Sequence, residues 1–142
     1  MIFKNTPIID AYEINLEYND DNRGFFARFF CDKEFKEKKL INKFIQINNS
    51  FTKKRGTIRG MHYQKKPQEE VKVIRCISGR IFDVIIDLRK KSNTYLNWYG
   101  IELSASNRKM LYVPKGCAHG FLTLTKNCEV LYLVSTAYSP KH

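Results

Sequence analysis

The sequence predicts an all-β fold of the sandwich or barrel kind, and three observations support this class. Short runs of strand-forming residues follow one another from Phe44 to near the end of the chain. Turn-forming residues (Gly, Pro, Asn and Ser) separate these runs at intervals of about ten residues, a spacing typical of sandwiches and barrels. The chain of 142 residues has the length of one domain, which we place at residues 1–142, and it is long enough to bury a core without cross-links.

The first element expected along the chain is a helix, and strands follow it. Residues 32–43 (DKEFKEKKLINK) have a helical rather than an alternating pattern, so we expect one short helix there. The runs after it are rich in β-branched and aromatic residues, which favour strands. These strands are expected at residues 44–51, 71–79, 80–89, 97–104, 109–114, 120–125 and 129–138.

The run RIFDVIIDLR at residues 80–89 shows the two-residue period of a strand. Its even-numbered apolar residues, from Phe82 to Ile86, form one purely apolar face. Its two acids, Asp83 and Asp87, fall on the opposite face. We therefore expect these acids either to meet solvent or to line a cavity.

Two short blocks contain the histidines that lie inside the chain. His62 belongs to the block RGMHYQ, and His119 belongs to the block VPKGCAHGF. In each block an Arg or Lys and a glycine precede the histidine, and the surrounding residues favour strands. Because an imidazole can gain or lose a proton near neutral pH, the pair predicts a polar pocket inside a β-structure.

The charge of the chain is strongly positive. The formal net charge is +11, from 25 Lys and Arg against 14 Asp and Glu. The lysines are interleaved with acids and asparagines, and no recognised nucleic-acid-binding motif accompanies them. We therefore expect a solvated basic surface, no nucleic-acid partner, and an anionic ligand such as a diphosphate.

Cysteine usage and hydrophobicity indicate the compartment. The four cysteines form no CxxC pair and lie among apolar or aromatic residues, so we expect buried free thiols. No charged leader precedes an apolar run, and the longest hydrophobic runs are only a few residues long. We therefore expect neither a signal peptide nor a membrane span, no membrane partner, and a cytoplasmic location.

Four blocks of the sequence, which together cover most of the chain, are similar to a known enzyme family. They are DNRGFFARFF (21–30), FIQINNSFTKKRGTIRGMHYQ (44–64), VKVIRCISGRIFDVIIDLRKKSNTYLNWYGIELSASNRKMLYVPKGCAHGF (71–121) and EVLYLVSTAYSP (129–140). In this order they resemble the RmlC-type nucleotide-sugar 3,5-epimerases.

The resemblance implies a fold, an assembly and a substrate. The fold would be a jelly-roll (cupin, or double-stranded β-helix) barrel, and the assembly a homodimer whose subunits exchange strands. The substrate would be a dTDP-sugar, a nucleotide-linked 4-keto-6-deoxy sugar of the dTDP-4-dehydro-6-deoxyglucose type. The enzyme would epimerise C3, C5 or both without a cofactor or a metal ion, for the synthesis of surface polysaccharide sugars.

The residues agree with this chemistry, which is proton abstraction next to a ketone. Such a reaction needs a base on one face of the sugar, an acid on the other, and a group that stabilises the enolate oxygen. His62 corresponds to the base of the family, and an imidazole suits that role. The resemblance assigns Tyr132 as the acid and Lys72 as the enolate stabiliser. In the run VKVIR, Lys72 shares a strand face with Ile74.

The resemblance also implies a set of substrate-binding residues. A guanidinium can make bidentate contacts to oxyanions, so Arg59 suits a diphosphate or a sugar. Arg23, in the RGFF block, matches a substrate-contacting position, and Gln46 and Asn48 match polar positions on the nucleotide side. His119 matches a second pocket histidine, and Tyr138 matches a pocket or stacking residue.

Two departures from the family pattern affect the expectation. The family carries a glutamate after the RGFF block, whereas this chain has Arg28, which leaves the identity of the sugar open. The family also continues beyond its YSP-x-H motif, with a substrate-contacting glutamate and an aspartate that pairs with the catalytic histidine, and this chain stops at His142. We expect a naturally short relative or a truncated product, in which the loss of this aspartate lowers the rate. Four acids in predicted strands could replace it, although the sequence places none of them beside the histidine: Asp83, Asp87, Glu102 and Glu129.

Three alternatives to a 3,5-epimerase stay open at this point. One is a catalytically impaired relative that binds nucleotide sugars, or a basic module that binds nucleic acid. Another is a mono-epimerase or 3,4-ketoisomerase, which shares the enolate chemistry. The third is a metal-dependent cupin with His62, His119 and Glu69 or Glu70 as ligands. Because Gln64 stands where the second histidine of a His-x-His pair would be, this ligand set is thin.

Overall fold

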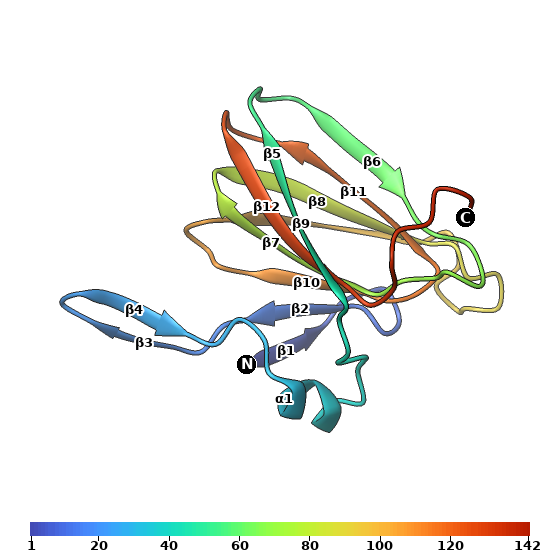
Figure 1. The fold of residues 1–142 in the computed structure, drawn as a ribbon, viewed down its shortest axis with the longest axis horizontal. Helices are drawn as coiled ribbons and strands as arrows, with labels where there is room; N and C mark the ends of the chain where they lie inside the picture. The colour runs from blue at the N-terminus through green and yellow to red at the C-terminus, as the bar shows by residue number, and fades with distance from the viewer.

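The computed structural model describes residues 1–142 as two facing antiparallel sheets, a separate hairpin and one short helix (Figure 1). The larger sheet has the order β1 (Ile2–Asn5), β2 (Tyr12–Asn15), β10 (Met110–Val113), β7 (Lys72–Ser78), β12 (Cys128–Val134) and β5 (Gln46–Thr52). The smaller sheet has the order β6 (Ile58–His62), β11 (Cys117–Thr123), β8 (Arg80–Asp87) and β9 (Trp98–Ser104). The hairpin, β3 (Tyr18–Asp21) with β4 (Gly24–Ala27), projects from the body.

The prediction of an all-β, jelly-roll fold with one short helix is confirmed. Neighbouring strands such as β7 and β12, or β10 and β2, come from distant parts of the chain and pair antiparallel. Two facing sheets built from such long-range antiparallel pairs are the arrangement of a jelly roll. The sheets stay separate and do not close into a continuous barrel.

All seven predicted strands are present, as β5 and β7 to β12. The strand β11 begins at Cys117, three residues before the predicted start at residue 120, so His119 lies within a strand. Five strands were not predicted, namely β1 to β4 and β6. Each of these has only four or five residues, and too few of them are buried to produce an alternating pattern.

The predicted helix is shorter than residues 32–43, because α1 covers only Asp32–Glu37. Lys39 adopts a left-handed conformation with a φ of 57°. The amides of Lys39 and Leu40 then bond to the carbonyls of Lys36 and Phe35, at 2.8 and 2.9 Å. This Schellman-type ending stops the helix and turns Leu40 back toward the cluster that contains Phe35.

Two hydrophobic clusters hold the elements together. One lies between the sheets and has 14 buried residues, among them Ile74, Ile85 and Leu103. The other lies on the outer face of the larger sheet, where Phe35 of α1 is fully buried. The rings of Phe3, Phe30 and Phe44 surround Phe35, and all three pack edge-on against it, with ring centroids 5.0 to 6.0 Å apart. This packing attaches the N-terminal region and α1 to the sheet.

The strand β8 turns its acidic face, not its purely apolar face, toward the interior. Asp83 and Asp87 are both 0% exposed, whereas Phe82 on the opposite face is 36% exposed. Arg89 forms two hydrogen bonds of 2.9 Å with the Asp87 carboxylate, and the hydroxyls of Ser92 and Thr94 also donate to it. Burial alone would raise the pKa of Asp87, but these bonds hold it well below its ordinary value. This cluster fixes the loop between β8 and β9.

The four cysteines are free thiols, as predicted. Cys76, Cys117 and Cys128 are buried, whereas Cys31 is half-buried. Burial raises the pKa of Cys76 to about 11 and that of Cys117 to about 12, so these thiols stay protonated and unreactive at neutral pH. Among the helices of the structure, none has the length and apolar character needed to cross a membrane.

Candidate active site

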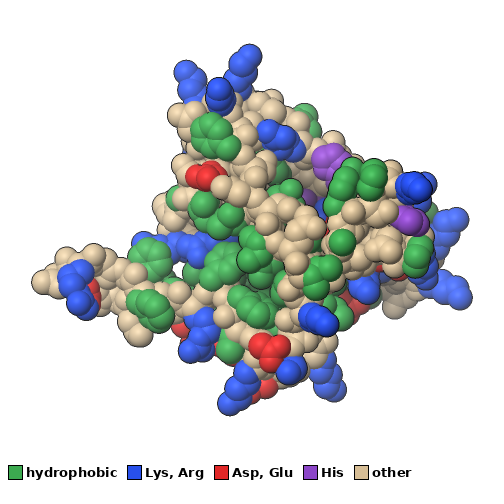
Figure 2. Space-filling view, in the orientation of Figure 1, with side chains coloured by type: hydrophobic (Ala, Val, Ile, Leu, Met, Phe, Trp, Pro, Cys, Tyr) green, Lys and Arg blue, Asp and Glu red, His purple; other side chains and the backbone are tan.

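A cavity of about 640 Å³ lies beside the end of β6, between β5, β7, β12 and the C-terminal residues. It brings together six of the nine predicted site residues: Gln46, Asn48, His62, Lys72, Tyr132 and Tyr138. In Figure 2, histidine side chains are at the surface on the side where the C-terminus lies in Figure 1. Strand pairing in the larger sheet brings Gln46, Asn48, Lys72 and Tyr132 together. His62 comes from β6 of the smaller sheet, and Tyr138 comes from the residues after β12.

His62 is the last residue of β6 and faces the cavity. Its side chain is exposed and makes no hydrogen bond within the chain. The neighbouring Gly60 has a φ of 119°, and a Cβ at this position would lie 2.5 Å from the Cα of Gly120. Glycine is therefore required where β6 crosses closely over β11, and this contact sets the position of His62.

Lys72 and Tyr132 enter the cavity from neighbouring strands. Lys72 is 9% exposed, and its Nζ lies 3.1 Å from Oε1 of Glu70, which also lines the cavity. Tyr132 pairs with Ile74 of β7 on one side and with Asn48 of β5 on the other. Because directly paired residues of an antiparallel sheet point to the same face, this register places Asn48 and Tyr132 in one cavity. Lys72 shares the face of Ile74, as predicted, since residues two apart in a strand point the same way.

The environment of Tyr132 favours its protonated form. Burial raises the pKa of its phenol, and the charge of Glu70 raises it further, whereas the charge of Arg59 lowers it. The net direction is upward, so the phenol holds its proton at neutral pH. A protonated phenol at a cavity wall can donate a proton or a hydrogen bond.

Gln46 and Asn48 form a polar edge of the cavity. They alternate along β5 and so face the same side, where Nε2 of Gln46 donates to Oδ1 of Asn48 at 2.7 Å. The nearby Tyr138 is 73% exposed, and its ring is free to contact a bound molecule.

The other three predicted residues lie outside the lining of this cavity. Arg59 is on β6, where its guanidinium donates to the Thr52 hydroxyl at 2.8 Å and to the Phe51 carbonyl at 3.2 Å. Arg23 is at the tip of the β3–β4 hairpin, where it pairs with Asp21 at 2.6 Å. Within one chain, Arg23 therefore lies outside the cavity, and its predicted role in substrate binding stays a prediction.

His119 lies behind His62, its cross-strand neighbour on β11. It is 8% exposed, and its Nε2 is 2.7 Å from Oδ1 of Asp83, while Oδ2 of this buried carboxylate has no hydrogen-bond partner. Asp83 is therefore the partner of His119 and not of His62, and Asp87 binds Arg89. Neither acid of β8 replaces the aspartate that the family pairs with its catalytic histidine.

Sequence reasoning missed two residues at this site. Glu70 and Gln64 were considered only in connection with a metal, yet Glu70 pairs with Lys72 and Gln64 joins three chain segments. The two-residue spacing of Glu70 and Lys72 was a usable signal, whereas the bonds of Gln64 depend on tertiary structure. The side chains proposed as metal ligands are not assembled, since no group of three His, Cys, Asp or Glu side chains could hold a metal ion.

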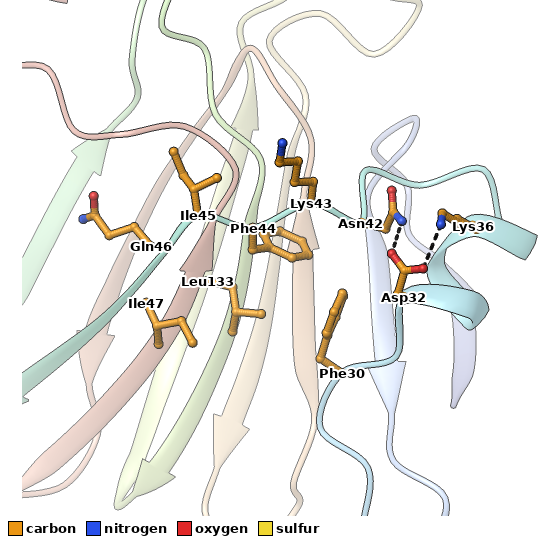
Figure 3. A pocket seen from close by; sticks show the side chains of 10 residues that line it. All are labelled: Phe30, Asp32, Lys36, Asn42, Lys43, Phe44, Ile45, Gln46, Ile47 and Leu133. Carbon is orange, nitrogen blue, oxygen red and sulfur yellow. Dashed lines mark hydrogen bonds and ion pairs between the residues drawn. The ribbon is translucent and has the colours of Figure 1, made fainter.

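A second hollow, of about 680 Å³, lies between α1 and β5 (Figure 3). Its apolar wall includes Phe30, Phe44 and Leu133, and two of its charged side chains, Asp32 and Lys36, are at the α1 end. There Asp32 accepts hydrogen bonds from Lys36, at 2.8 Å, and from Asn42. This hollow contains no histidine or tyrosine and none of the three predicted catalytic residues.

A jelly roll with a histidine, a tyrosine and a lysine around an open cavity is typical of the cupin-type sugar epimerases. The chain belongs to the dTDP-4-dehydrorhamnose 3,5-epimerase family, whose sequence model matches residues 5–142. The enzyme of this name from Salmonella typhimurium is 40% identical over 143 residues, which cover 99% of this chain and 76% of the relative. The one from Methanothermobacter thermautotrophicus is 43% identical, over 99% of this chain and 75% of the relative.

Solved structures agree with this assignment. The Bacillus anthracis dTDP-4-dehydrorhamnose 3,5-epimerase, with TDP and PPi bound, has a TM-score of 0.96 at 41% identity, over 99% of this chain and 81% of that one. The Legionella pneumophila enzyme in complex with dTDP-4-keto-L-rhamnose has a TM-score of 0.92 at 34% identity, over 99% and 74%. A 3'-monoepimerase from Streptomyces bikiniensis, in complex with dTDP-quinovose, is more distant, with 0.88 at 28%, over 96% and 69%.

Proposed function

We propose that this chain is an isomerase that epimerises both C3 and C5 of a dTDP-linked 4-keto-6-deoxy sugar, converting dTDP-4-dehydro-6-deoxyglucose to dTDP-4-dehydrorhamnose. Epimerisation at only one of these carbons is the alternative. The observation that carries the proposal is the meeting of His62, Lys72 and Tyr132 in one cavity of a chain that belongs to this family. The solved relatives that hold TDP or a dTDP-sugar support the nucleotide part of the substrate.

Each of the three residues has a separate task in the reaction. His62 removes a proton from a carbon next to the ketone, and the electron pair moves onto the ketone oxygen. The ammonium of Lys72 stabilises the resulting enolate oxygen. Tyr132 returns a proton to the other face of the carbon, which inverts its configuration, and solvent then removes the proton from His62 and reprotonates the tyrosine.

The position of Lys72 supports this assignment. Its ammonium is nearly buried and pairs with Glu70, so it is held in place rather than moving freely in solvent. A preorganised charge in a cavity stabilises a developing oxyanion without the cost of reorienting water. Glu70 is therefore part of the proposed catalytic arrangement.

Substrate binding is assigned to residues around these three. Gln46 and Asn48 form the polar edge that suits the nucleotide side, and the exposed ring of Tyr138 suits a stacking contact. Arg59 suits the diphosphate, and His119, which Asp83 orients, donates or accepts hydrogen bonds behind His62. The net charge of +11 favours the approach of an anionic substrate.

We also propose a homodimer in which the β3–β4 hairpin reaches the other subunit. The outer face of β5 exposes Ile47 at 68% and Phe51 at 49%, and the hairpin exposes Phe26 at 75%. Figure 2 shows hydrophobic side chains across the middle of the face where β5 and β12 lie in Figure 1. Exposed apolar patches of this kind mark protein–protein contacts, and the exchange would bring Arg23 to the partner's cavity.

The remaining parts of the proposal concern the domain and its surroundings. We treat residues 1–142 as one catalytic domain that needs no cofactor or metal ion. The free thiols support a reducing compartment, which we take to be the cytoplasm. We assign no nucleic-acid or membrane partner to the basic surface.

The test is to incubate the protein with dTDP-4-keto-6-deoxyglucose in D₂O and to follow deuterium at C3 and C5 by NMR. Deuterium at both carbons, with formation of the rhamno product, is expected. Deuterium at one carbon would instead indicate a mono-epimerase or a 3,4-ketoisomerase. No deuterium together with normal dTDP binding would mean a binding protein without this activity and would refute the proposal.

A further inference from the structure

Gln64 is a buried amide whose hydrogen-bonding groups are all used by main-chain atoms. Gln64 lies two residues after His62 and is only 6% exposed. Its Nε2 donates to the carbonyl of Gln68 at 2.9 Å and to that of Ala137 at 3.2 Å. Its Oε1 accepts from the amide of Ser139 at 2.6 Å. The side chain therefore joins the end of β6, the loop before β7 and the C-terminal residues.

The two bonds to the C-terminal residues are made to the main chain just before and just after Tyr138. Ala137 and Ser139 are its immediate neighbours, so a single amide group holds the main chain on both sides of this tyrosine. The ring of Tyr138 is 73% exposed and lines the cavity, and its hydroxyl makes no hydrogen bond within the chain. Two further bonds also hold the C-terminal residues, from the Lys65 amide to the His142 carbonyl and from the Thr136 hydroxyl to the Glu69 carbonyl, both at 3.0 Å. The bonds of Gln64 are the ones that connect the immediate neighbours of Tyr138 directly to the segment that carries His62.

Only a neutral carboxamide satisfies all three partners. Two carbonyls require two N–H donors, and one N–H requires an acceptor, which is the inventory of a glutamine side chain. A glutamate at this position would lose both donors and would place a carboxylate against two carbonyl oxygens. Because the site is buried, such unpaired polar groups are costly.

We infer that Gln64 is a positioning residue that holds Tyr138 at the cavity wall, at a fixed place relative to His62, so that the tyrosine ring aligns the bound nucleotide sugar for proton abstraction. This inference rests on the proposed function, which supplies the substrate. Gln64 itself touches no substrate in this arrangement and acts through Tyr138.

The main test compares Gln64→Glu with Gln68→Glu. Gln68 lies nearby, its side chain makes no hydrogen bond, and the substitution adds the same charge. At pH 8 we expect kcat/KM of Gln64→Glu to fall about 10- to 100-fold, as a small misplacement of substrate does, whereas Gln68→Glu changes less than about 3-fold on the scale of an ordinary surface substitution. As the pH falls toward 5.5, the ratio of the two activities should recover, because a protonated carboxyl regains one donor. Equal activities of the two variants at pH 8 would overturn the inference.

A double-mutant cycle tests whether Gln64 acts through Tyr138. In the Tyr138→Ala background, Gln64→Glu should cause little further loss of kcat/KM, since the group that it positions is already absent. Independent, additive losses would mean that Gln64 supports the fold or another residue, and would also overturn the inference. If Gln64→Glu does not fold, Gln64→Asn, which is neutral and one methylene shorter, takes its place in the cycle and is compared with Gln68→Asn at pH 8.

Hydrogen exchange gives a readout that does not depend on activity. In Gln64→Leu, the Ser139 amide should exchange at least about tenfold faster than in the parent protein, corresponding to the loss of one hydrogen bond. The amide of Ile74 in β7 should keep its protection. Unchanged protection of the Ser139 amide in Gln64→Leu would refute the positioning role of Gln64, even if the proposed function held. An inactive parent protein with normal Ser139 protection would refute only the proposed function.

Discussion

Replacement of His62 by asparagine separates catalysis from folding and binding. The change removes the only group that we assign as the base, and it keeps a polar side chain of similar size at the end of β6. We expect deuterium incorporation at both C3 and C5 to fall together, because one base serves both carbons in the proposed reaction. General base catalysis contributes about 10² to 10⁴ in rate, so exchange should fall by that factor.

The structure also sets the expected effect on stability. His62 is exposed and makes no hydrogen bond within the chain, so the free energy of unfolding should change by less than about 0.5 kcal/mol. For a chain of 142 residues the entropy of unfolding is about 0.3 kcal/mol per kelvin. The melting temperature should therefore shift by less than about 2 °C, and dTDP affinity should stay close to that of the parent protein.

A matched control is available in His142, which lines the same cavity. Its Nδ1 is 2.7 Å from the hydroxyl of Ser139, and we assign it no role in proton transfer. The assays are NMR-detected exchange in D₂O, calorimetric titration with dTDP, and thermal unfolding. Our reasoning is refuted if His62→Asn retains exchange, or if His142→Asn loses as much exchange as His62→Asn.

Three further predictions follow from other parts of the structure. Tyr132→Phe should allow proton loss but impair inversion by about 10²-fold or more, so that NMR detects deuterium washout into substrate without product; normal inversion would exclude Tyr132 as the acid. Phe35→Ala removes the centre of an aromatic cluster and should lower the free energy of unfolding by about 3–5 kcal/mol, or the melting temperature by about 10–17 °C. Ile58→Ala, at a residue 73% exposed, should change the melting temperature by less than about 2 °C, and equal shifts in the two variants would contradict the packing. Asp87→Asn should cost about 3–5 kcal/mol at pH 7, because it unpairs Arg89. The folded-state pKa of Asp87 is below its ordinary value of 3.8, so its contribution to the free energy of unfolding is complete above that pH and is lost as the pH falls further. Chemical unfolding at pH 7 and pH 3 should show a smaller difference in the free energy of unfolding between the parent protein and Asp87→Asn at pH 3. An equal difference at both pH values would contradict this assignment.

The agreement between sequence and structure is closest where one local pattern determines an element. The run at residues 71–79 is rich in strand-forming residues, and it forms β7 with Lys72 and Ile74 on one shared face, as predicted. The helix is less well predicted, because its end depends on Lys39 adopting a positive φ and on Leu40 packing against Phe35. A run of charged residues contains no signal for such a turn.

The candidate site shows the same division. The block RGMHYQ identified His62, and the similarity to the family identified Lys72 and Tyr132, which the structure places in one cavity. The sequence did not reveal that Glu70 would pair with Lys72 or that Asp83 would bind His119. Such pairs depend on which residues become cross-strand neighbours.

The order of hydrophobic and turn-forming residues was enough to establish an all-β chain, most of its strands and the blocks that carry the chemistry, because these are properties of short segments. Tertiary structure decided which face of β8 is buried, where α1 ends, and that Arg23 lies on a projecting hairpin rather than in the cavity of its own chain. It also decided that Gln64 forms hydrogen bonds with the main chain on both sides of Tyr138. These features depend on strand register and on contacts between residues far apart in the chain, and local sequence patterns hold no information about either.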